Sequence, residues 1–412
     1  MFWLAQAEDL DYYLLPGSET GMAHQLLSGH IPILAPDSLV LGLAMGASLL
    51  LLARLLSLVV DRRQGSGRLS GRQALLLRLA IFVGFFAAWE LALQSGPHRP
   101  EETYIPDPLA FWKANPAVAQ RVLETGKGLV GVDRRRQVGL FDQDHAGPKP
   151  PGTWRIAFMG DSQVLSSNGQ PYAGNLTYSK ALEAHLGRDG LAGPQGQPVE
   201  ILNAGMSGYS SWQGLMLLRS EVLRLEPDVV VEAFGYHDSN LGLSVDREVL
   251  TDDPWTFEVR TRLYRSRVCV LLRNLLLRIQ AARNDRSDPS TRVPRVPPAQ
   301  FAENLRTLER MGREHGFRVV FLLEPLRDPG DWDRSRDHRE AARRTAQELG
   351  VPLLDGFQLF REMSQQERDR LFHDAIHLTP AGHARMEELV RRGLVETRLL
   401  APVPRRAKPG PG

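Results

Sequence analysis

The stretch IAFMGDSQVLSSNG, Ile156–Gly169, decides the fold because an apolar run ends abruptly on polar residues. Ile156 to Met159 lead directly into Gly160, Asp161 and Ser162, with no turn residues between them. Such a run is typical of a buried strand. A serine just past its end is either a helix N-cap, which stabilises by about 1 kcal/mol, or a nucleophile. The tripeptide alone does not separate these two roles.

Residues 153–400 alternate short apolar runs with amphipathic helical patterns. Strands are predicted at RIAFMG, VEILNAG, DVVVEAFG, FRVVFLLEP and VPLLD, and helices at SWQGLMLLRSEVLRL, PAQFAENLRTLERMGREHG and RSRDHREAARRTAQELG. Nearly all-apolar strands between amphipathic helices indicate a parallel sheet that is covered on both faces. Sheets of this kind place their chemistry beyond the carboxyl ends of the strands. We therefore expect Ser162 to lie at the functional edge of an α/β domain.

Polar and glycine residues also follow the next two strands, and a histidine motif stands near the C-terminus. The residues concerned are Asn203, Gly205 and Gly208 in LNAGMSGYSSWQ, Gly235, His237 and Asp238 in FGYHDSN, and Asp374 and His377 in HDAIHLTPAGH. Glycine allows backbone N–H groups to approach a ligand closely. The sequence therefore predicts that several strand ends and a terminal Asp-x-x-His converge on one rim of the sheet.

The order of these blocks resembles the SGNH (GDSL) hydrolase family. The resemblance runs from about Arg155 to the helix after His377 and implies a flavodoxin-like three-layer α/β/α fold that hydrolyses esters. It implies Ser162 as the nucleophile, His377 as the general base and Asp374 as the residue that orients His377. It also implies an oxyanion hole of the Ser162 and Gly205 backbone N–H groups with a side chain at position 237. Asp161, Asp238 and Asn203 are expected to support this site.

The chemistry of the side chains agrees with these roles. A serine hydroxyl becomes a good nucleophile when an imidazole removes its proton, and a carboxylate fixes the tautomer of that imidazole. Asp374 and His377 are three residues apart and can pair within one tight turn. For Asp161 we expect a hydrogen bond to the loop backbone rather than a part in catalysis.

His237 departs from the family pattern, which has asparagine at this position as a side-chain oxyanion donor. A neutral imidazole has one N–H and can replace that donor. The other interpretations are a variant site with altered substrate preference and a domain that has lost hydrolytic activity. Asn240 offers an amide two residues beyond Asp238, but a shift of register would be needed to use it.

A zinc site is the rival interpretation of the C-terminal histidines. His373-Asp374-x-x-His377 resembles the spacing that places two imidazoles on one helical face. Pro380 follows almost at once and would end or kink the required helix, although His383 offers a third ligand. We predict no metal and no organic cofactor.

Two apolar runs near the N-terminus, about 38–60 and 74–93, predict a transmembrane hairpin. At about 1.5 Å per residue each run can cross a core about 30 Å thick. The loop between them carries Arg62, Arg63, Arg68 and Arg72, whereas residues 1–32 contain no Lys or Arg. The positive-inside rule then places the loop in the cytoplasm and the rest of the chain outside.

This topology predicts five parts: an extracytoplasmic tail (1–37), the hairpin (38–94), a linker (95–152), the catalytic domain (153–400) and a disordered tail (401–412). The formal net charge of +2, from 50 basic and 48 acidic residues, gives no nucleic-acid footprint. The basic, apolar pattern of 258–286 is interpreted either as a helix packed on the catalytic domain or as a segment lying on an anionic leaflet.

Together these features predict a serine esterase or deacylase of the inner membrane, tethered by two helices, with its catalytic domain on the periplasmic or extracellular side. Its expected partners are the lipid bilayer and an acyl-ester substrate on a glycan or lipid. The sequence leaves open which protein partners the chain has. The alternatives are an O-acyltransferase that uses the same nucleophile and a non-catalytic glycan-binding or assembly protein of the envelope.

Overall fold

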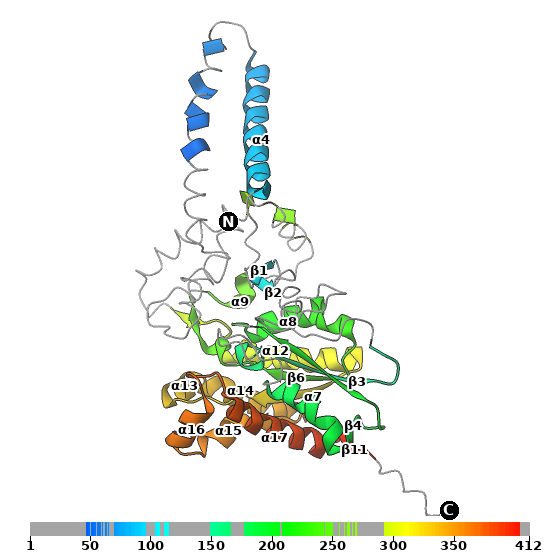
Figure 1. Ribbon diagram of the computed structural model, residues 1–412. Coiled ribbons are helices and arrows are strands. Elements are labelled where there is room, and N and C mark those ends of the chain that lie inside the picture. Colours follow the sequence, from blue (N-terminus) through cyan, green and yellow to red (C-terminus); the bar gives the residue numbers. More distant parts are fainter. Residues whose placement is uncertain are drawn as a thin grey trace, which may run out of the picture.

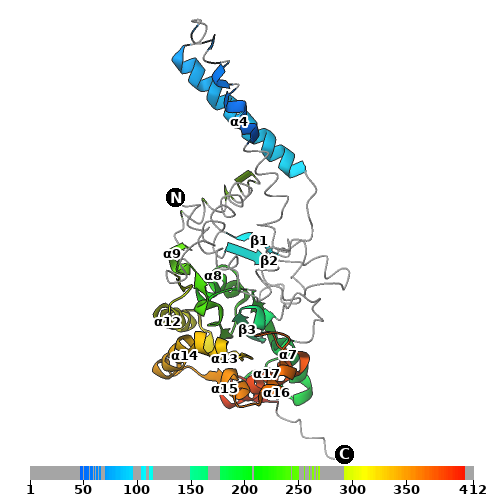
Figure 2. The same ribbon diagram turned by 90° about the vertical axis from the view of Figure 1, so that its left-hand side faces the viewer.

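The computed structural model describes residues 71–95, 104–107, 111–114, 149–165, 177–206, 208–242, 244–249 and 292–403, with scattered residues in 47–70 and 255–269. Figures 1 and 2 show an α/β domain and a helical stalk that projects from it. The predicted N-terminal tail 1–37, most of the first predicted span and most of the basic segment 258–286 lie outside the described residues.

A parallel five-stranded sheet forms the centre of the α/β domain, as the apolar runs predict. Its strand order is β10-β9-β6-β3-β5. The strands are β3 (Trp154–Gly160), β5 (Val199–Gly205), β6 (Val229–Ala233), β9 (Arg318–Leu323) and β10 (Leu353–Asp355). In chain order this is the 2-1-3-4-5 arrangement of flavodoxin-like folds, which binds ligands where the order reverses. That reversal lies between β3 and β6.

The register brings three strand ends to the same level. Gly160 at the end of β3 lies opposite Gly205 of β5 on one side and Ala233 of β6 on the other. The residues that follow these strands therefore start from one edge of the sheet. This edge carries the motifs that the sequence singled out.

Helices cover both faces of the sheet, because successive residues of a strand point to opposite faces. Ile156 and Phe158 pack with α7 (Tyr178–Asp189) and α17 (Pro380–Glu396), whereas Ala157 and Met159 pack with α8 (Ser211–Ser220) and α12 (Pro298–His315). Figure 1 shows α8 and α12 on one side of the sheet and α7 and α17 on the other. The three-layer arrangement that the resemblance implies is present.

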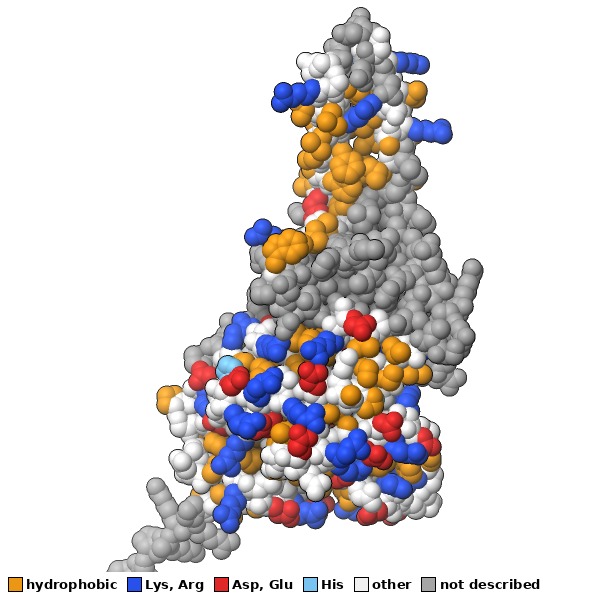
Figure 3. Space-filling model, turned by 180° about the vertical axis from the view of Figure 1, so that it is seen from behind, with side chains coloured by type: hydrophobic (Ala, Val, Ile, Leu, Met, Phe, Trp, Pro, Cys, Tyr) orange, Lys and Arg blue, Asp and Glu red, His pale blue; other side chains and the backbone are white. Residues whose placement is uncertain are grey.

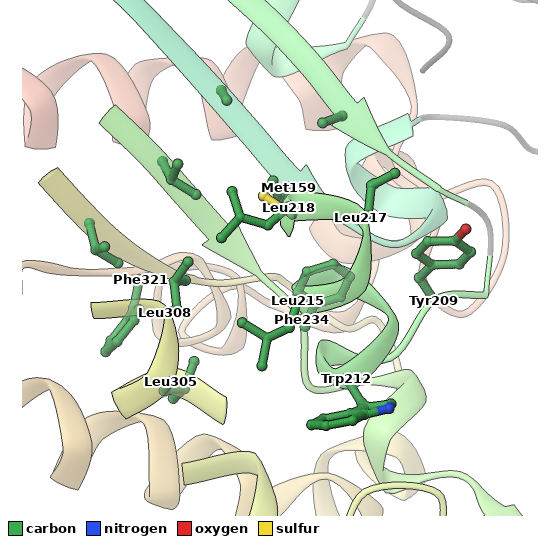
Figure 4. Close-up of a cluster of buried hydrophobic side chains, with 14 of the residues drawn as sticks. Met159, Tyr209, Trp212, Leu215, Leu217, Leu218, Phe234, Leu305, Leu308 and Phe321 are labelled. Carbon is green, nitrogen blue, oxygen red and sulfur yellow. The ribbon is translucent and has the colours of Figure 1, made fainter. Parts of the chain in front are cut away.

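The larger core lies between the sheet and helices α8 and α12. Figure 4 shows Leu215 and Leu218 of α8 and Leu305 and Leu308 of α12 turned toward Phe234, just beyond β6. All of these side chains are buried. At about 1.5–3 kcal/mol for each large apolar side chain removed from water, this layer contributes strongly to the stability of the strand ends.

The remaining elements are short and surround the sheet. They are α6 (Ser162–Leu165), η3 (Val222–Leu225), η4 (His237–Ser239), α9 (Asp246–Val249), α13 (Pro329–Arg334), α14 (Arg336–Leu349), α15 (Gly356–Arg361), α16 (Gln365–Leu371), β4 (Leu191–Ala192), β7 (Leu241–Gly242), β8 (Val293–Pro294) and β11 (Ala401–Pro402). The predicted helix over 211–225 is divided, because α8 ends at Ser220 and a 3₁₀ turn follows.

Two short strand pairs lie in segments predicted to be a tail or a linker. Ala401 and Pro402 form β11, which pairs antiparallel with β4, so the folded domain continues past residue 400 into the predicted tail. The predicted linker 95–152 contains an antiparallel strand pair, β1 (Tyr104–Asp107) with β2 (Phe111–Ala114). Backbone hydrogen bonding between two short segments is not visible in a Pro-rich composition.

The stalk contains one long apolar helix, α4 (Gly71–Ser95). Within it, Gly71–Leu91 is the one stretch among the described residues that is long and apolar enough to cross a membrane. The first predicted span is not confirmed as a second one, because its described helical part, Ala47–Leu58, is shorter. Figures 1 and 2 show these pieces alongside α4, and Figure 3 shows Lys and Arg side chains gathered toward the end farthest from the α/β domain.

The other end of α4 contacts a segment that follows α9 in the chain. The Glu90 carboxylate accepts hydrogen bonds from Ser266 Oγ at 2.7 Å and from the Val268 N–H at 3.1 Å. Val268 is buried and packs against Phe85, Phe86 and Trp89. Glu90 therefore has a specific partner at the end of the apolar helix that faces the α/β domain.

Candidate active site

Ser162 lies immediately beyond β3 and is the first residue of the short helix α6. The Asp161 carboxylate accepts a hydrogen bond from the Gln163 N–H at 2.8 Å, and the Leu165 N–H donates to the Asp161 carbonyl at 3.1 Å. This is the backbone contact that we expected for Asp161. The turn holds the Ser162 side chain, which is buried except for about 3% of its surface, at the edge of the sheet.

Asp374 and His377 lie on one small closed loop. Phe372 and Leu378 form an isolated antiparallel bridge at its base, and the His373 N–H donates to the His377 carbonyl at 2.8 Å. Helix α17 begins only at Pro380, with the Thr379 side chain as its N-cap. His377 is therefore a loop residue, and the pair does not have the helical geometry of the zinc motif.

A hydrogen-bonded chain connects this loop to Ser162. His377 Nε2 lies 2.8 Å from Ser162 Oγ, and His377 Nδ1 lies 2.7 Å from Asp374 Oδ2. The other Asp374 oxygen accepts the N–H groups of His377 at 2.8 Å and Ile376 at 2.9 Å. Partial burial raises the pKa of Asp374, but these hydrogen bonds and the charge of His377 outweigh it and lower the pKa to about 2. Asp374 is thus an anion over the working pH range of most enzymes.

The structure does not support the predicted use of the Gly205 N–H in an oxyanion hole. This N–H donates at 3.0 Å to Asn203 Oδ1, while Asn203 Nδ2 donates at 2.9 Å to the Val164 carbonyl. A Cβ on Gly205 would meet the Leu165 nitrogen at 2.4 Å. The glycine is thus required by the close approach of β5 to α6, and Asn203 clamps the two elements together.

Gly208 is the second glycine of this loop, and a buried network fixes its peptide group. Its backbone has φ of +73°, a conformation that favours glycine. Arg295 Nη1 donates at 2.8 Å to the Gly208 carbonyl, and Arg295 Nη2 bonds Asp246 Oδ2 at 2.8 Å and Gln213 Oε1 at 2.6 Å. Arg295 and Asp246 are almost fully buried, so this pair holds the loop from inside the domain.

His237 and Asp238 lie beyond β6, opposite the end of β3. Asp238 accepts hydrogen bonds from the Ser211 N–H at 3.0 Å and the Gly235 N–H at 3.1 Å, so it joins the β5 loop to the β6 loop. His237 Nε2 lies 3.7 Å from Asp161 Oδ2, and His237 Nδ1 lies 2.8 Å from Asn240 Nδ2. Burial and nearby positive charges hold the pKa of His237 well below its usual value, so its ring is neutral.

Buried carboxyl groups lie just beyond the ends of β3, β6 and β9. Burial raises the pKa of Asp161 and of Asp238 to about 7. Glu324, just past β9, accepts a hydrogen bond from Tyr178 Oη at 3.1 Å, and burial raises its pKa well above the ordinary value. Glu324 was not among the predicted site residues, although its position directly after the apolar run FRVVFLL was a usable signal. Arg295 was not among them either, because it lies far from every motif in the sequence.

The described residues include no group of three His, Cys, Asp or Glu side chains that could hold a metal ion. His383 lies on α17, where its Nδ1 accepts the Tyr178 N–H at 3.3 Å, and burial lowers its pKa to about 3. His383 therefore has a structural contact that joins α17 to the start of α7.

A comparison with protein families identifies the family of the chain. The model of the GDSL-like Lipase/Acylhydrolase family matches residues 158–385, more than half of the chain. The chain belongs to this family and is by class a serine ester hydrolase. No curated protein matches the sequence significantly.

Several solved structures are similar to the chain. The lipase/acylhydrolase from Enterococcus faecalis is 20% identical over 60% of this chain and 98% of its own, with a TM-score of 0.41. The acetyl xylan esterase AlAXEase is 14% identical over 58% and 99%, with a TM-score of 0.40. LAE5, an α/β hydrolase from the metagenome of Lake Arreo, Spain, is 17% identical over 62% and 97%, with a TM-score of 0.38.

Proposed function

We propose that the protein hydrolyses O-acyl esters through an acyl-enzyme on Ser162, with His377 as the general base and Asp374 as its orienting carboxylate. The observation that carries this proposal is the chain of two hydrogen bonds, 2.7 Å from Asp374 to His377 and 2.8 Å from His377 to Ser162. Side chains from two distant parts of the sequence, Ser162 and the Asp374–His377 loop, meet in the arrangement that activates a serine.

In the first half-reaction, Ser162 Oγ attacks the ester carbonyl while His377 Nε2 takes the hydroxyl proton. The bond between the former carbonyl carbon and the alcohol oxygen then breaks, and His377 gives the proton to the departing alcohol. The acyl group remains on Ser162 Oγ. In the second half-reaction, His377 removes a proton from water while the water oxygen attacks the acyl carbon. The bond between the acyl carbon and Ser162 Oγ then breaks, His377 returns the proton to Oγ, and the acid is released. Asp374 remains an anion throughout and stabilises the imidazolium form of His377.

The negative charge that develops on the carbonyl oxygen needs donors at the edge of the sheet. We assign the Ser162 N–H and the His237 side chain to this role, and Gly208 in place of Gly205. Gly208 is supported by its left-handed backbone and by the Arg295 hydrogen bond that fixes its peptide group. Preorganised donors of this kind act strongly because they do not reorient during the reaction.

We further propose that α4 tethers this domain to a membrane and that the domain lies outside the cytoplasm. The apolar length of α4, the exposure of Leu75, Leu79 and Val83, and the arginines at the far end of the stalk support this topology. The substrate is then an O-acylated glycan or lipid that lies near the membrane surface.

Covalent labelling with a fluorophosphonate tests the nucleophile directly. The full chain in detergent is treated with the probe, and its intact mass is compared with that of Ser162→Ala. We expect one adduct on the wild type and none on the variant. Folded wild-type protein that takes up no probe, or an adduct that persists in Ser162→Ala, contradicts the assignment.

A second experiment identifies the ester. Nitrophenyl esters of increasing acyl length and O-acetylated glycans are offered to the wild type and to Ser162→Ala, with and without a sugar acceptor. Release of free acid that depends on Ser162 supports hydrolysis. Acylated product that forms only when the acceptor is present would instead identify an acyltransferase with the same nucleophile.

A further inference from the structure

The position of the proton on the His237 ring follows from the residue that contacts it. Asn240 Nδ2 lies 2.8 Å from His237 Nδ1. An amide nitrogen has hydrogens to donate and accepts none, so Nδ1 must be the acceptor of this bond. A neutral imidazole carries one proton. That proton is therefore on Nε2, the ring atom that faces Asp161 at 3.7 Å.

Burial and the neighbouring side chains keep the His237 ring neutral. It is buried, which holds its pKa well below the usual value, and the nearby Arg295 and Arg334 guanidinium groups further disfavour a positive charge on the ring, as does His377 whenever it is protonated. Tyr236 packs edge to face against it, with ring centroids 5.1 Å apart. Asp161 is the acidic group facing Nε2, and burial raises the pKa of this carboxyl to about 7.

Asn240 is itself held in place by the buried network described above. Its backbone carbonyl accepts the Arg295 N–H at 2.8 Å, and its own N–H donates to the His237 carbonyl at 3.3 Å. Only about 2% of its surface is exposed. Because Arg295 is also paired with Asp246, the Asn240 backbone, from which the side-chain amide projects, is held by both the β6 loop and the β8 segment.

We propose that Asn240 is a positioning residue that holds His237 in the Nε2–H tautomer, so that the imidazole N–H takes the part of a side-chain oxyanion donor. The donor is then a pair, an amide that sets the tautomer and a ring that presents the N–H. This inference rests on the proposed function for the role of the donor, but the tautomer itself is a property of the resting protein.

The test combines nitrogen NMR with kinetics on the full chain in detergent. The protein is labelled with ring-¹⁵N histidine, and the His237 signals are assigned as those that disappear in His237→Asn. We expect wild-type His237 to show a protonated Nε2 and an unprotonated Nδ1 at pH 8. A protonated Nδ1 in the wild type overturns the proposal, whether or not the protein turns over an ester.

Asn240→Asp tests the control that Asn240 exerts on the ring. A carboxylate accepts and does not donate, so it draws a proton to Nδ1 and leaves the ring reversed or doubly protonated. We expect this change in the NMR signals together with a loss of about 10²-fold or more in kcat, the size of one lost oxyanion donor. An unchanged tautomer, or a reversed tautomer with wild-type kcat, overturns the proposal.

Two further variants separate this role from a merely structural one. Asn304→Asp is a matched change of a buried asparagine that bonds Ser211 Oγ at 2.8 Å, and it should leave the His237 tautomer as in the wild type. In a His237→Asn background the ring is gone, so Asn240→Asp should cost much less in kcat than it does in the wild type. An equal loss in both backgrounds shows that Asn240 acts on stability alone.

Discussion

The candidate site has two halves that are built in different ways. The proposed base His377 and its proposed orienting carboxylate Asp374 are neighbours on one short loop and bond each other directly. The groups proposed to bind the carbonyl oxygen depend instead on a buried network that runs from Ser210 through Asp246 to Arg295 and Asn240. A local pair can be recognised from its spacing, whereas a network that joins distant segments becomes visible only in three dimensions.

The largest expected effect lies in the first half. Ser162→Ala and His377→Ala should each lower kcat by about 10⁴- to 10⁶-fold, and the double variant should be barely worse, because the two residues act in one step. Steady-state hydrolysis of a nitrophenyl ester measures this. His373→Ala is the matched control, since the loop uses its backbone N–H rather than its ring. Multiplicative losses in the double variant would mean that the two residues work separately.

The second half should respond more weakly. His237→Ala should lower kcat by about 10²- to 10³-fold with little change in KM, because the lost contact forms mainly in the transition state. His237→Asn, which restores an N–H donor, should retain more activity than the alanine variant. An active alanine variant beside an inactive asparagine variant would contradict the donor role.

Two buried arginines offer a direct comparison between the site and the rest of the fold. Arg295→Met should destabilise the protein by about 3–5 kcal/mol, because it leaves Asp246 buried without its cation, and it should also lower kcat. Arg155→Met breaks a pair with the partly exposed Glu200 at the opposite end of β3. We expect it to lower stability with kcat within about twofold of wild type. Urea unfolding measures the stability of both variants, and ester kinetics measure their kcat. Equal kcat values for Arg295→Met and Arg155→Met would show that the Arg295 network does not support catalysis.

The smallest effect concerns pH and stability. Burial raises the pKa of Asp161 to about 7, so the folded protein keeps a proton that the unfolded chain releases above about pH 4. Its contribution therefore lowers the free energy of unfolding as the pH rises from about 4 to 7. Asp161→Asn should flatten this slope and preserve the bond from the Gln163 N–H. Urea midpoints at pH 5, 6, 7 and 8 measure it, and an unaltered slope would show that Asp161 is ionised in the fold.

Much of the α/β domain could be predicted from local patterns. All five strands were found because buried parallel strands are continuous apolar runs, and α12 and α14 because their apolar residues recur at helical spacing. The strands and helices depend on short-range sequence and on general topology. The meeting of Ser162 with His377 was instead implied by the resemblance to the SGNH (GDSL) hydrolase family, since His377 lies in a loop between α16 and α17 and follows no strand of the parallel sheet.

The errors arose where the outcome depends on side-chain contacts between distant segments. The family resemblance made Gly205 the expected donor, but it could not show that the Asn203 side chain accepts the Gly205 N–H. Asn240 was considered only as a substitute for His237, and in the structure it bonds that ring instead. The second membrane span remains a prediction, since the described part of residues 38–60 is too short to establish it.

The closed loop that carries Asp374 and His377 has a mechanical consequence. The bridge between Phe372 and Leu378 and the bond from the His373 N–H make the acid and base one rigid unit. Any displacement of this unit changes the gap between His377 and Ser162 while the contact between His377 and Asp374 stays constant. A movement of the loop thus leaves the hydrogen bond between Asp374 and His377 intact and changes only the distance from His377 Nε2 to Ser162 Oγ.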